Sequence, residues 1–95
     1  MGSSFEWDLA KDAENQLKHG VAFSEAQLAF LDPDRVIARD AKHSGAEERF
    51  YCFGQVELGV LTVRFTYRGM KIRIFGAGFW SRGKKVYEAH RKVHK

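Results

Sequence analysis

The sequence predicts an α+β domain in which helices pack on one face of an antiparallel β-sheet. Two observations support this fold class. Apolar residues recur with a helical spacing before Pro33 and alternate, as in strands, after it. The later strands are separated by only a few residues, and such tight connections join antiparallel neighbours. We therefore expect one domain, residues 1–95, built from a strand, two helices, three or four strands and a closing helix.

The N-terminal half begins with a short predicted strand, Phe5–Trp7, followed by a helix. Asp8 is placed as the N-cap of this helix, since its carboxylate accepts hydrogen bonds from the free N–H groups of a first helical turn. The helix covers Leu9–Lys18 and stops at Gly20. Its expected apolar stripe contains Ala10, Ala13 and Leu17.

The second helix begins at a predicted capping box formed by Ser24 and Gln27. Phe23 and Leu28 stand at the two positions of a hydrophobic staple around the same turn. The helix ends shortly before Pro33, because proline disfavours helical geometry at the residue that precedes it.

Four segments with strand-like alternation follow: Arg35–Arg39, Arg49–Val56, Val60–Tyr67 and Lys71–Phe75. In the third of these, the face directed at the core contains Leu61, Val63, Phe65 and Tyr67. Its opposite, polar face contains Thr62, Arg64 and Thr66. A polar loop is expected at Ala41–Glu47.

The C-terminal end is predicted to be a helix. Gly76-Ala77-Gly78 ends the last strand, and Ser81 caps the helix that follows. The expected apolar stripe of this helix contains Val86, His90 and Val93.

Charge is divided between the two halves of the chain. Residues 1–48 contain five Lys/Arg and ten Asp/Glu, a net charge of −5, whereas residues 49–95 contain eleven Lys/Arg and two Asp/Glu, a net charge of +9. Like charges crowded into one half of a small domain repel each other. We therefore expect a polyanion, or an acidic partner protein, to neutralise the basic half.

Composition excludes several classes of protein. The apolar fraction of 44% is enough for a packed core, which excludes a disordered basic tail. No apolar run approaches the roughly 18 residues of a membrane span, and the acidic N-terminus is unlike a signal peptide. We therefore expect a cytoplasmic protein without a membrane partner. Cys52 has no partner for an internal disulfide, and the four histidines lack zinc-ligand spacing, so no metal or other cofactor is expected.

The hairpin between the last two strands gives the sharpest functional inference. A two-residue turn at Arg68-Gly69 would pair Phe65 with Ile72 and Val63 with Ile74. A three-residue loop would instead set Phe65 against Arg73. We favour the first register, because a slip by one residue would turn both isoleucines toward water.

That register places Arg64 directly across from Arg73 on the polar face. Like charges opposite each other on a sheet cost about 0.2–1 kcal/mol, so such a pair suggests a use. Two guanidinium groups about 5 Å apart bind a phosphate bidentately and stabilise charge that develops on it. The alternative is that each arginine pairs with a carboxylate, such as Glu48 or Glu57.

Two histidines are candidates for proton transfer. His19 closes the first helix, where the alternative is a solvated helix end that complements the helix dipole. His43 lies close in sequence to Glu47 and Glu48, either as an acid–base pair or as a loop ion cluster.

Aromatic and basic residues alternate near the C-terminal helix. Phe79 and Trp80 are followed by Arg82, Lys84 and Lys85, as expected of a surface on which nucleotides stack. The alternative is that the two rings only cover the edge of the sheet. Residue chemistry alone therefore indicates a basic sheet face suited to RNA phosphate, with Arg49 and Lys71 extending the phosphate track.

A set of spaced residues in the N-terminal half is typical of one protein family: Phe5-Glu6-Trp7-Asp8, Lys11, Asn15, Lys18-His19-Gly20, Phe23, Ala26, Phe30 and Asp32-Pro33. The set continues with Glu48-Arg49, Gly54, Val63–Tyr67 and Ile72-Arg73-Ile74. Through these residues nearly the whole chain resembles the BrnT toxins, which belong to the RelE-like superfamily of type II toxin–antitoxin systems.

This resemblance implies a RelE-like fold and metal-independent RNA cleavage that inhibits translation. A ribose 2′-hydroxyl would attack the adjacent phosphate while basic residues stabilise the charge. A BrnA-like antitoxin would bind the toxin in a hetero-oligomer, cover its basic face and supply all DNA binding. Arg64, Arg73 and His19 are the expected catalytic residues, while Arg49, Lys71, Arg82, Lys84, Phe79 and Trp80 are expected to bind RNA.

One departure from the family pattern affects the expected site. Many members follow the Ile-Arg-Ile strand with Ser-Ala-Arg, whereas this chain has Gly76-Ala77-Gly78. Arg64, Arg82 or Lys84 would replace the missing arginine, or the chain has altered specificity or no catalysis. The other functions that fit the same residues are a non-catalytic RNA-binding module and a protein that only docks an acidic partner.

Overall fold

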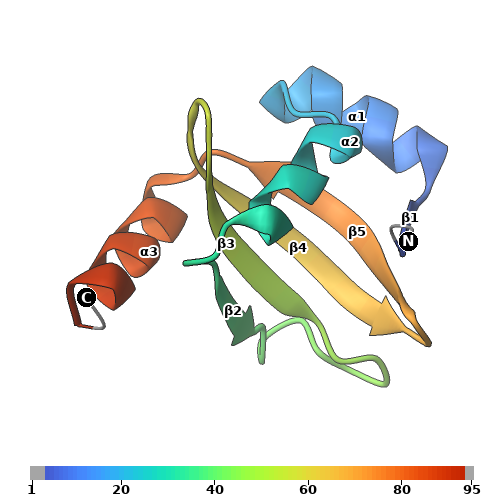
Figure 1. Cartoon of the computed structure of the whole chain (residues 1–95). Coiled ribbons are helices and arrows are strands. Elements are labelled where there is room, and N and C mark those ends of the chain that lie inside the picture. Colours follow the sequence, from blue (N-terminus) through green and yellow to red (C-terminus); the bar gives the residue numbers. More distant parts are fainter. Residues whose placement is uncertain (1–3, 94–95) are drawn as a thin grey trace.

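The computed structural model describes residues 4–93 as an α+β domain with a five-stranded sheet (Figure 1). The strands lie in the order β1-β5-β4-β3-β2. The helices lie on both sides of the sheet, which corrects the expectation that they share one face. The elements are β1 (Phe5–Trp7), α1 (Leu9–His19), α2 (Phe23–Ala26), the 3₁₀ helix η1 (Gln27–Leu31), β2 (Val36–Arg39), β3 (Phe50–Val56), β4 (Gly59–Arg68), β5 (Lys71–Gly78) and α3 (Ser81–Val93).

The sheet is mixed rather than purely antiparallel. Strands β2 to β5 are antiparallel neighbours, as the short connections predicted. Strand β1, however, pairs in parallel with β5 and sets Glu6 opposite Arg73. Residues 8–70 separate these two strands in sequence, so no turn signal could indicate their pairing.

The main core lies between the sheet and the α2–η1 segment, on what we call the α2 face. The sheet contributes Cys52, Leu61, Val63, Phe65, Ile74 and Ala77, and the helical segment contributes Phe23, Ala26 and Ala29. Gly54 of β3 allows close contact, because a Cβ there would stand 2.2 Å from the carbonyl oxygen of Ala29. The predicted inward face of β4 is confirmed for Leu61, Val63 and Phe65, whereas Tyr67 is exposed.

The opposite side, the α3 face, is only partly covered. Tyr87 of α3 packs with Phe53 and Val60, and its hydroxyl donates a hydrogen bond to Asp32. The residues of α3 that are buried are Gly83 and Tyr87, whereas Val86 and Val93 of the predicted stripe are exposed. Gly83 is needed because a Cβ there would stand 2.0 Å from Thr62 Oγ1. The sequence prediction missed that Gly83 and Tyr87, which are four residues apart, form the contact of α3 with the sheet.

Helix α1 lies along the part of β5 that β1 leaves uncovered. The Asn15 side chain donates to the carbonyl oxygen of Ala77 and accepts from its N–H group, at 2.9 and 3.2 Å. This polar contact replaces the predicted apolar stripe, since Leu17 is exposed. The predicted ends are confirmed: Asp8 caps the first turn, and Gly20 has the left-handed φ of 69°.

The capping box of the second helical segment lies two residues earlier than predicted. Ala22 is the N-cap, and its N–H group donates to the side chain of Glu25. Phe23 N–H donates to the carboxylate of Asp12, which joins this turn to α1. The box of Ser24 and Gln27 is therefore wrong, because Glu25 is better placed at the third helical position.

Strand β5 continues through Gly76-Ala77-Gly78, where the sequence predicted its end. A register shift makes this possible: Phe65 pairs with Ile74, Arg64 pairs with Gly76, and Phe75 has no residue opposite it. Ile74 and Ala77 consequently both face the core. Within the described residues, no helix is long and apolar enough to cross a membrane.

We predict that Gly54→Ala destabilises the fold and that Gly45→Ala does not. The new methyl group at residue 54 would overlap the backbone of Ala29, whereas a Cβ at residue 45 meets no atom within 4 Å. Overpacking of this kind costs about 1–3 kcal/mol. Thermal unfolding should show a Tm lower by roughly 4–8 °C for each kcal/mol in the first variant. Equal Tm values for the two variants would contradict the close packing of η1 on β3.

Candidate active site

A groove of about 730 Å³ opens on the α3 face, between the beginning of α3 and the loop after β2. Clefts of this size commonly hold small ligands or parts of larger ones. The polar, charged and aromatic residues that line it are Arg39, Asp40, Lys42, His43, Tyr51, Phe53, Thr62, Arg64, Trp80 and Arg82. Arg64, Trp80 and Arg82 are residues that the sequence singled out for RNA.

A histidine–carboxylate pair stands at one wall of the groove. His43 Nδ1 lies 2.8 Å from Asp40 Oδ2, with the side chain of Asp40 only 6% exposed and that of His43 49% exposed. The acid beside His43 is therefore Asp40 and not the Glu47 or Glu48 that the sequence suggested. Those two residues pair with Arg68 and Arg39. The three-residue spacing of Asp40 and His43 within a turn was the available signal.

The environment keeps Asp40 charged and Tyr51 neutral. Burial raises the pKa of Asp40, but hydrogen bonds with the side chain and N–H group of His43 and with Tyr51 outweigh it, so its pKa lies below the ordinary 3.8. Burial and the neighbouring Asp40 charge raise the pKa of Tyr51. We assign the Nδ1 proton of His43 to its contact with the carboxylate, which leaves Nε2 for the groove.

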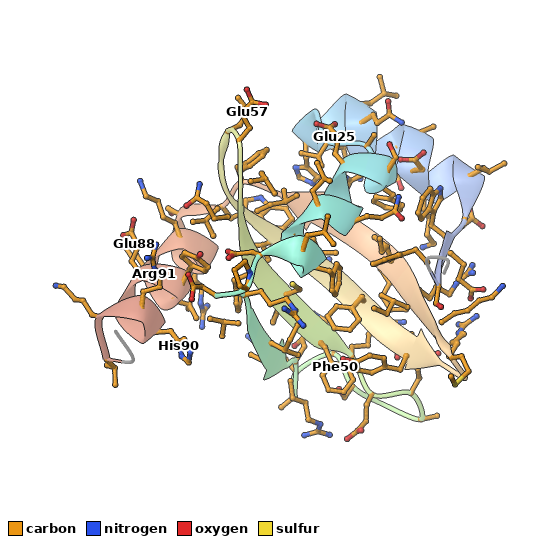
Figure 2. All side chains as sticks on the ribbon, in the orientation of Figure 1. Glu25, Phe50, Glu57, Glu88, His90 and Arg91 are labelled. Atoms are coloured by element: carbon orange, nitrogen blue, oxygen red, sulfur yellow. The ribbon has the colours of Figure 1, made fainter. Side chains whose placement is uncertain are left out.

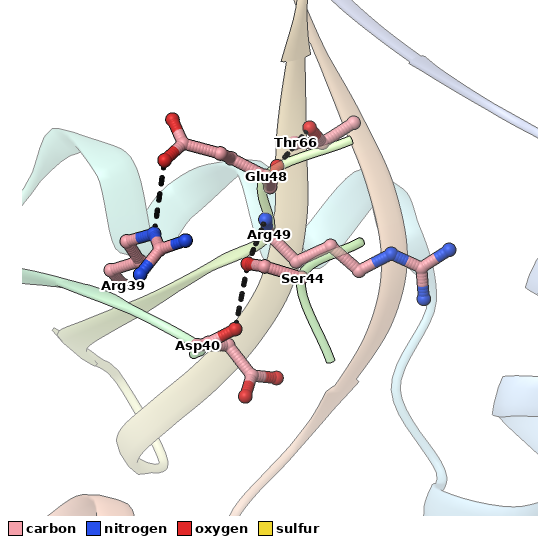
Figure 3. Close-up of polar contacts among 6 residues, drawn as sticks. All are labelled: Arg39, Asp40, Ser44, Glu48, Arg49 and Thr66. Atoms are coloured by element: carbon pink, nitrogen blue, oxygen red, sulfur yellow. Dashed lines mark hydrogen bonds and ion pairs between the residues drawn. The ribbon is translucent and has the colours of Figure 1, made fainter. Parts of the chain in front are cut away.

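The loop between β2 and β3 holds Asp40 of this pair in position (Figure 3). Ser44 Oγ donates to the carbonyl oxygen of Asp40 and accepts from the N–H group of Arg49, at 2.8 and 2.9 Å. The Thr66 hydroxyl donates to the carbonyl oxygen of Glu48. The N–H group of Asp40 also donates to the carbonyl oxygen of Arg49 at 2.7 Å. These bonds fix both ends of the loop against each other and against β4.

Two arginines in the groove are available to a ligand. Neither Arg64 nor Arg82 forms an ion pair or hydrogen bond with another residue in 4–93. Burial raises the pKa of Tyr51, and the positive charges of Arg64 and Arg82 partly offset this rise. Both guanidinium groups therefore lie close enough to the Tyr51 hydroxyl to interact with it electrostatically. A phosphate in the groove would therefore meet two positive charges near Tyr51.

The predicted hairpin register is wrong by two residues. The turn residues are Gly69 and Met70, so Arg68 pairs with Lys71 and Thr66 pairs with Arg73. Gly69 has a φ of 60°, and a glycine suits the first position of such a hairpin turn. A shift by two keeps every side chain on its predicted face. Arg64 and Arg73 therefore share the α3 face as diagonal neighbours, roughly 7–8 Å apart between Cα atoms, and are not directly opposite.

Arg73 has a carboxylate partner from the start of the chain. Its Nη1 lies 3.2 Å from Glu6 Oε2, and Lys71 Nζ lies 4.0 Å from the other oxygen of the same carboxylate. The alternative of a carboxylate partner thus holds for Arg73, with Glu6 in place of Glu48 or Glu57. Neither Arg73 nor Lys71 lines the groove.

Trp80 forms the aromatic wall of the groove and packs on Gly78. Its ring atoms lie 2.6 and 2.7 Å from the position that a Cβ at residue 78 would take. His19 contacts Trp80 edge to face, with ring centroids 5.1 Å apart, but does not line the groove. Any side chain at residue 78 would displace this tryptophan.

The other predicted RNA-binding residues lie outside the groove. Phe79 and Lys84 line a separate hollow together with Leu58 and Glu88. The Arg49 guanidinium stands over the ring of Phe75, 4.4 Å from its centroid. No three His, Cys, Asp or Glu side chains among the described residues are grouped to hold a metal ion.

The two acidic residues of the basic half do not neutralise the groove. Figure 2 shows Glu57 at the tip of the turn between β3 and β4, and Glu88 on α3. Neither residue lines the groove; each instead lines a smaller hollow beside Phe79. The carboxylate that does line the groove is Asp40, which is bonded to His43, so neither Glu57 nor Glu88 competes with an anion for Arg64 and Arg82.

We predict that Asp40→Asn destabilises the protein at neutral pH and that the difference from wild type shrinks in acid. Because folding lowers the pKa of Asp40 below 3.8, its contribution is present above that pH and is lost as the pH falls through the folded value. Urea unfolding at pH 7, 5 and 3 measures this difference. Asp34→Asn is the control, since Asp34 is exposed and pairs with Arg91 at 4.0 Å. A difference that stays constant with pH would contradict the assignment.

Comparison with known proteins gives a family for this chain. A family model described as the ribonuclease toxin BrnT of type II toxin–antitoxin systems matches residues 7–83. No curated protein matches the sequence. The matched range contains every residue that lines the groove except Val86. Because the match covers more than half of the chain, the protein belongs to the BrnT family of ribonuclease toxins.

Proposed function

We propose that this protein is the endoribonuclease toxin of a type II toxin–antitoxin pair and that it cleaves RNA in the groove on the α3 face. One observation carries the proposal. The groove brings together two arginines that have no partner within residues 4–93 and a histidine held by a buried carboxylate. This arrangement provides both phosphate binding and proton transfer.

Arg64 and Arg82 bind the scissile phosphate. Guanidinium groups form bidentate hydrogen bonds with phosphate oxygens and keep their charge at any physiological pH. In the reaction, negative charge grows on the non-bridging oxygens, and two fixed cations stabilise that state more than the ground state. Arg82 supplies the second guanidinium that the resemblance placed at residue 78, where Trp80 leaves no space for a side chain.

His43 carries the proton transfer. Its Nε2 removes the proton from a ribose 2′-hydroxyl, and the 2′-oxygen then forms a bond to the adjacent phosphorus. The bond from phosphorus to the 5′-oxygen breaks, and that oxygen takes up a proton from water. The products are a 2′,3′-cyclic phosphate and a 5′-hydroxyl end. Asp40 is a positioning residue, which orients the imidazole and stabilises its protonated form.

The remaining predicted residues have supporting roles in this proposal. Trp80 stacks on a base beside the scissile phosphate. Arg73, Lys71 and Arg49 extend the positive surface along the open part of the α3 face. His19 supports Trp80 by its ring contact, while Phe79 and Lys84 would meet RNA only beyond the groove.

The wider properties of the protein are also proposals. The α2–η1 segment packed on a largely antiparallel sheet supports a RelE-like fold. A cytoplasmic location, metal-independent cleavage and inhibition of translation fit the family of the chain. A BrnA-like antitoxin would bind this toxin in a hetero-oligomer and supply the DNA binding.

We predict that Arg64→Ala abolishes growth inhibition when the protein is expressed without its antitoxin. Loss of one group that stabilises developing charge typically lowers the rate by 10²–10³. Arg68→Ala is the matched control, because Arg68 lies on the same strand but pairs with Glu47 outside the groove. If both variants inhibited growth as strongly as the wild type, Arg64 would have no role in cleavage.

We also predict that His43→Gln lowers RNA cleavage by about 10²–10⁴, the usual contribution of a general base. RNA binding should stay within a few-fold of wild type, because the two arginines remain. Cleavage is measured with a labelled RNA, and the product ends are tested for 2′,3′-cyclic phosphate.

Two other results would identify the alternative functions. RNA binding that weakens steeply with salt, without any cleavage by the wild type, would indicate a non-catalytic RNA-binding module. A tight complex with an acidic protein encoded next to it, without affinity for RNA, would indicate a protein that only docks a partner.

A further inference from the structure

The bulge in β5 places an aromatic ring on the polar side of the sheet. Ile74 and Ala77 both face the core, and Phe75, which has no residue opposite it on β4, lies between them. Phe75 is half-buried and belongs to neither apolar cluster. The role of this ring is therefore not explained by the core.

Arg49 covers this ring. Its guanidinium carbon lies 4.4 Å from the ring centroid, within the range of a cation–π contact. Arg49 forms no ion pair with the residues described here, although its N–H group is held by Ser44. Figure 3 shows its side chain extending away from Ser44 and Asp40. The guanidinium is thus fixed by stacking, while its N–H groups stay available.

The arginine–phenylalanine pair lies next to the groove. The Arg64 side chain passes over Gly76, with its Cδ 3.9 Å from the position that a Cβ there would take. Gly76 directly follows Phe75, so Arg64 and the stacked pair occupy neighbouring positions on the α3 face. The loop that carries Arg49 also carries the Asp40–His43 pair.

We propose that Arg49 on Phe75 forms a second subsite, which stacks a nucleobase of single-stranded RNA next to the phosphate held by Arg64. This subsite rests on the proposed function, because it extends the same RNA strand beyond the groove. Unpaired bases stack on aromatic rings and on guanidinium planes, and bases within a duplex are not available for this. The N–H groups of Arg49 bind the phosphate of the same nucleotide.

The test is a binding measurement that does not depend on cleavage. A fluorescent hexamer of 2′-O-methyl RNA has no free 2′-hydroxyl and cannot be cut by the proposed reaction. Arg49→Lys keeps the charge but removes the planar group, so we expect affinity to fall about fivefold or more. Arg68→Lys is the matched control and should bind within twofold of wild type, since Arg68 lies outside the groove and pairs with Glu47.

Abasic substitutions in the hexamer locate the stacked base. With wild-type protein, removal of one particular base should weaken binding, and in Arg49→Lys and Phe75→Leu the same removal should have no further effect. Thermal unfolding of each variant confirms that it is folded. The subsite would be overturned if Arg49→Lys bound the hexamer as tightly as the wild type, or if removal of the base weakened binding equally in both proteins. The cleavage assignment would remain in either case. A wild-type protein that does not bind the hexamer would overturn both.

Discussion

The bulge at Phe75 sets the geometry on which the candidate site depends. It lets Ile74 and Ala77 face the same core, and it shifts the pairing so that Gly76 and Gly78 lie beneath Arg64 and Trp80. An unshifted strand would set Phe75 opposite Arg64 and place Gly76 toward the core. Asn15 stabilises the shifted segment, because its amide satisfies both backbone groups of Ala77 at the uncovered edge. Bulges often adjust side chains next to active sites in this way.

Charge within the fold is less one-sided than the sequence suggests. Acidic residues of the first half reach basic residues of the second half, in the pairs Glu6–Arg73, Glu47–Arg68 and Asp34–Arg91. These exposed or half-exposed pairs contribute little stability individually. Within residues 49–93, the arginines that remain without an ion pair all lie on the α3 face: Arg49, Arg64 and Arg82. These three guanidinium groups thus lie in the groove or beside it.

Local patterns in the sequence predicted the elements, the helix caps at Asp8 and Gly20, and the face on which Arg64 lies. The alternation of apolar and polar residues cannot distinguish strand registers that differ by two residues. The predicted cross-strand partner of Arg64 was therefore wrong, whereas the predicted face of the sheet was right. The ion pair of Arg73 depends on the parallel contact of β1 with β5, between opposite ends of the chain. The position of α3 depends on the small size of Gly83, which apolar periodicity does not count. Asp40 was missed because its burial is a tertiary property.

The proposed site requires that RNA binds across the α3 face and not elsewhere. The most direct measurement is an NMR titration of isotope-labelled protein with uncleavable 2′-O-methyl RNA, following arginine Nε–H and histidine ring signals. We expect the signals of Arg64, Arg82 and His43 to shift together and saturate at one stoichiometry, whereas the signal of Arg68, which lies outside the groove and pairs with Glu47, should change little. Shifts confined to α1 and the α2–η1 segment, with Arg64 and His43 unchanged, would contradict it.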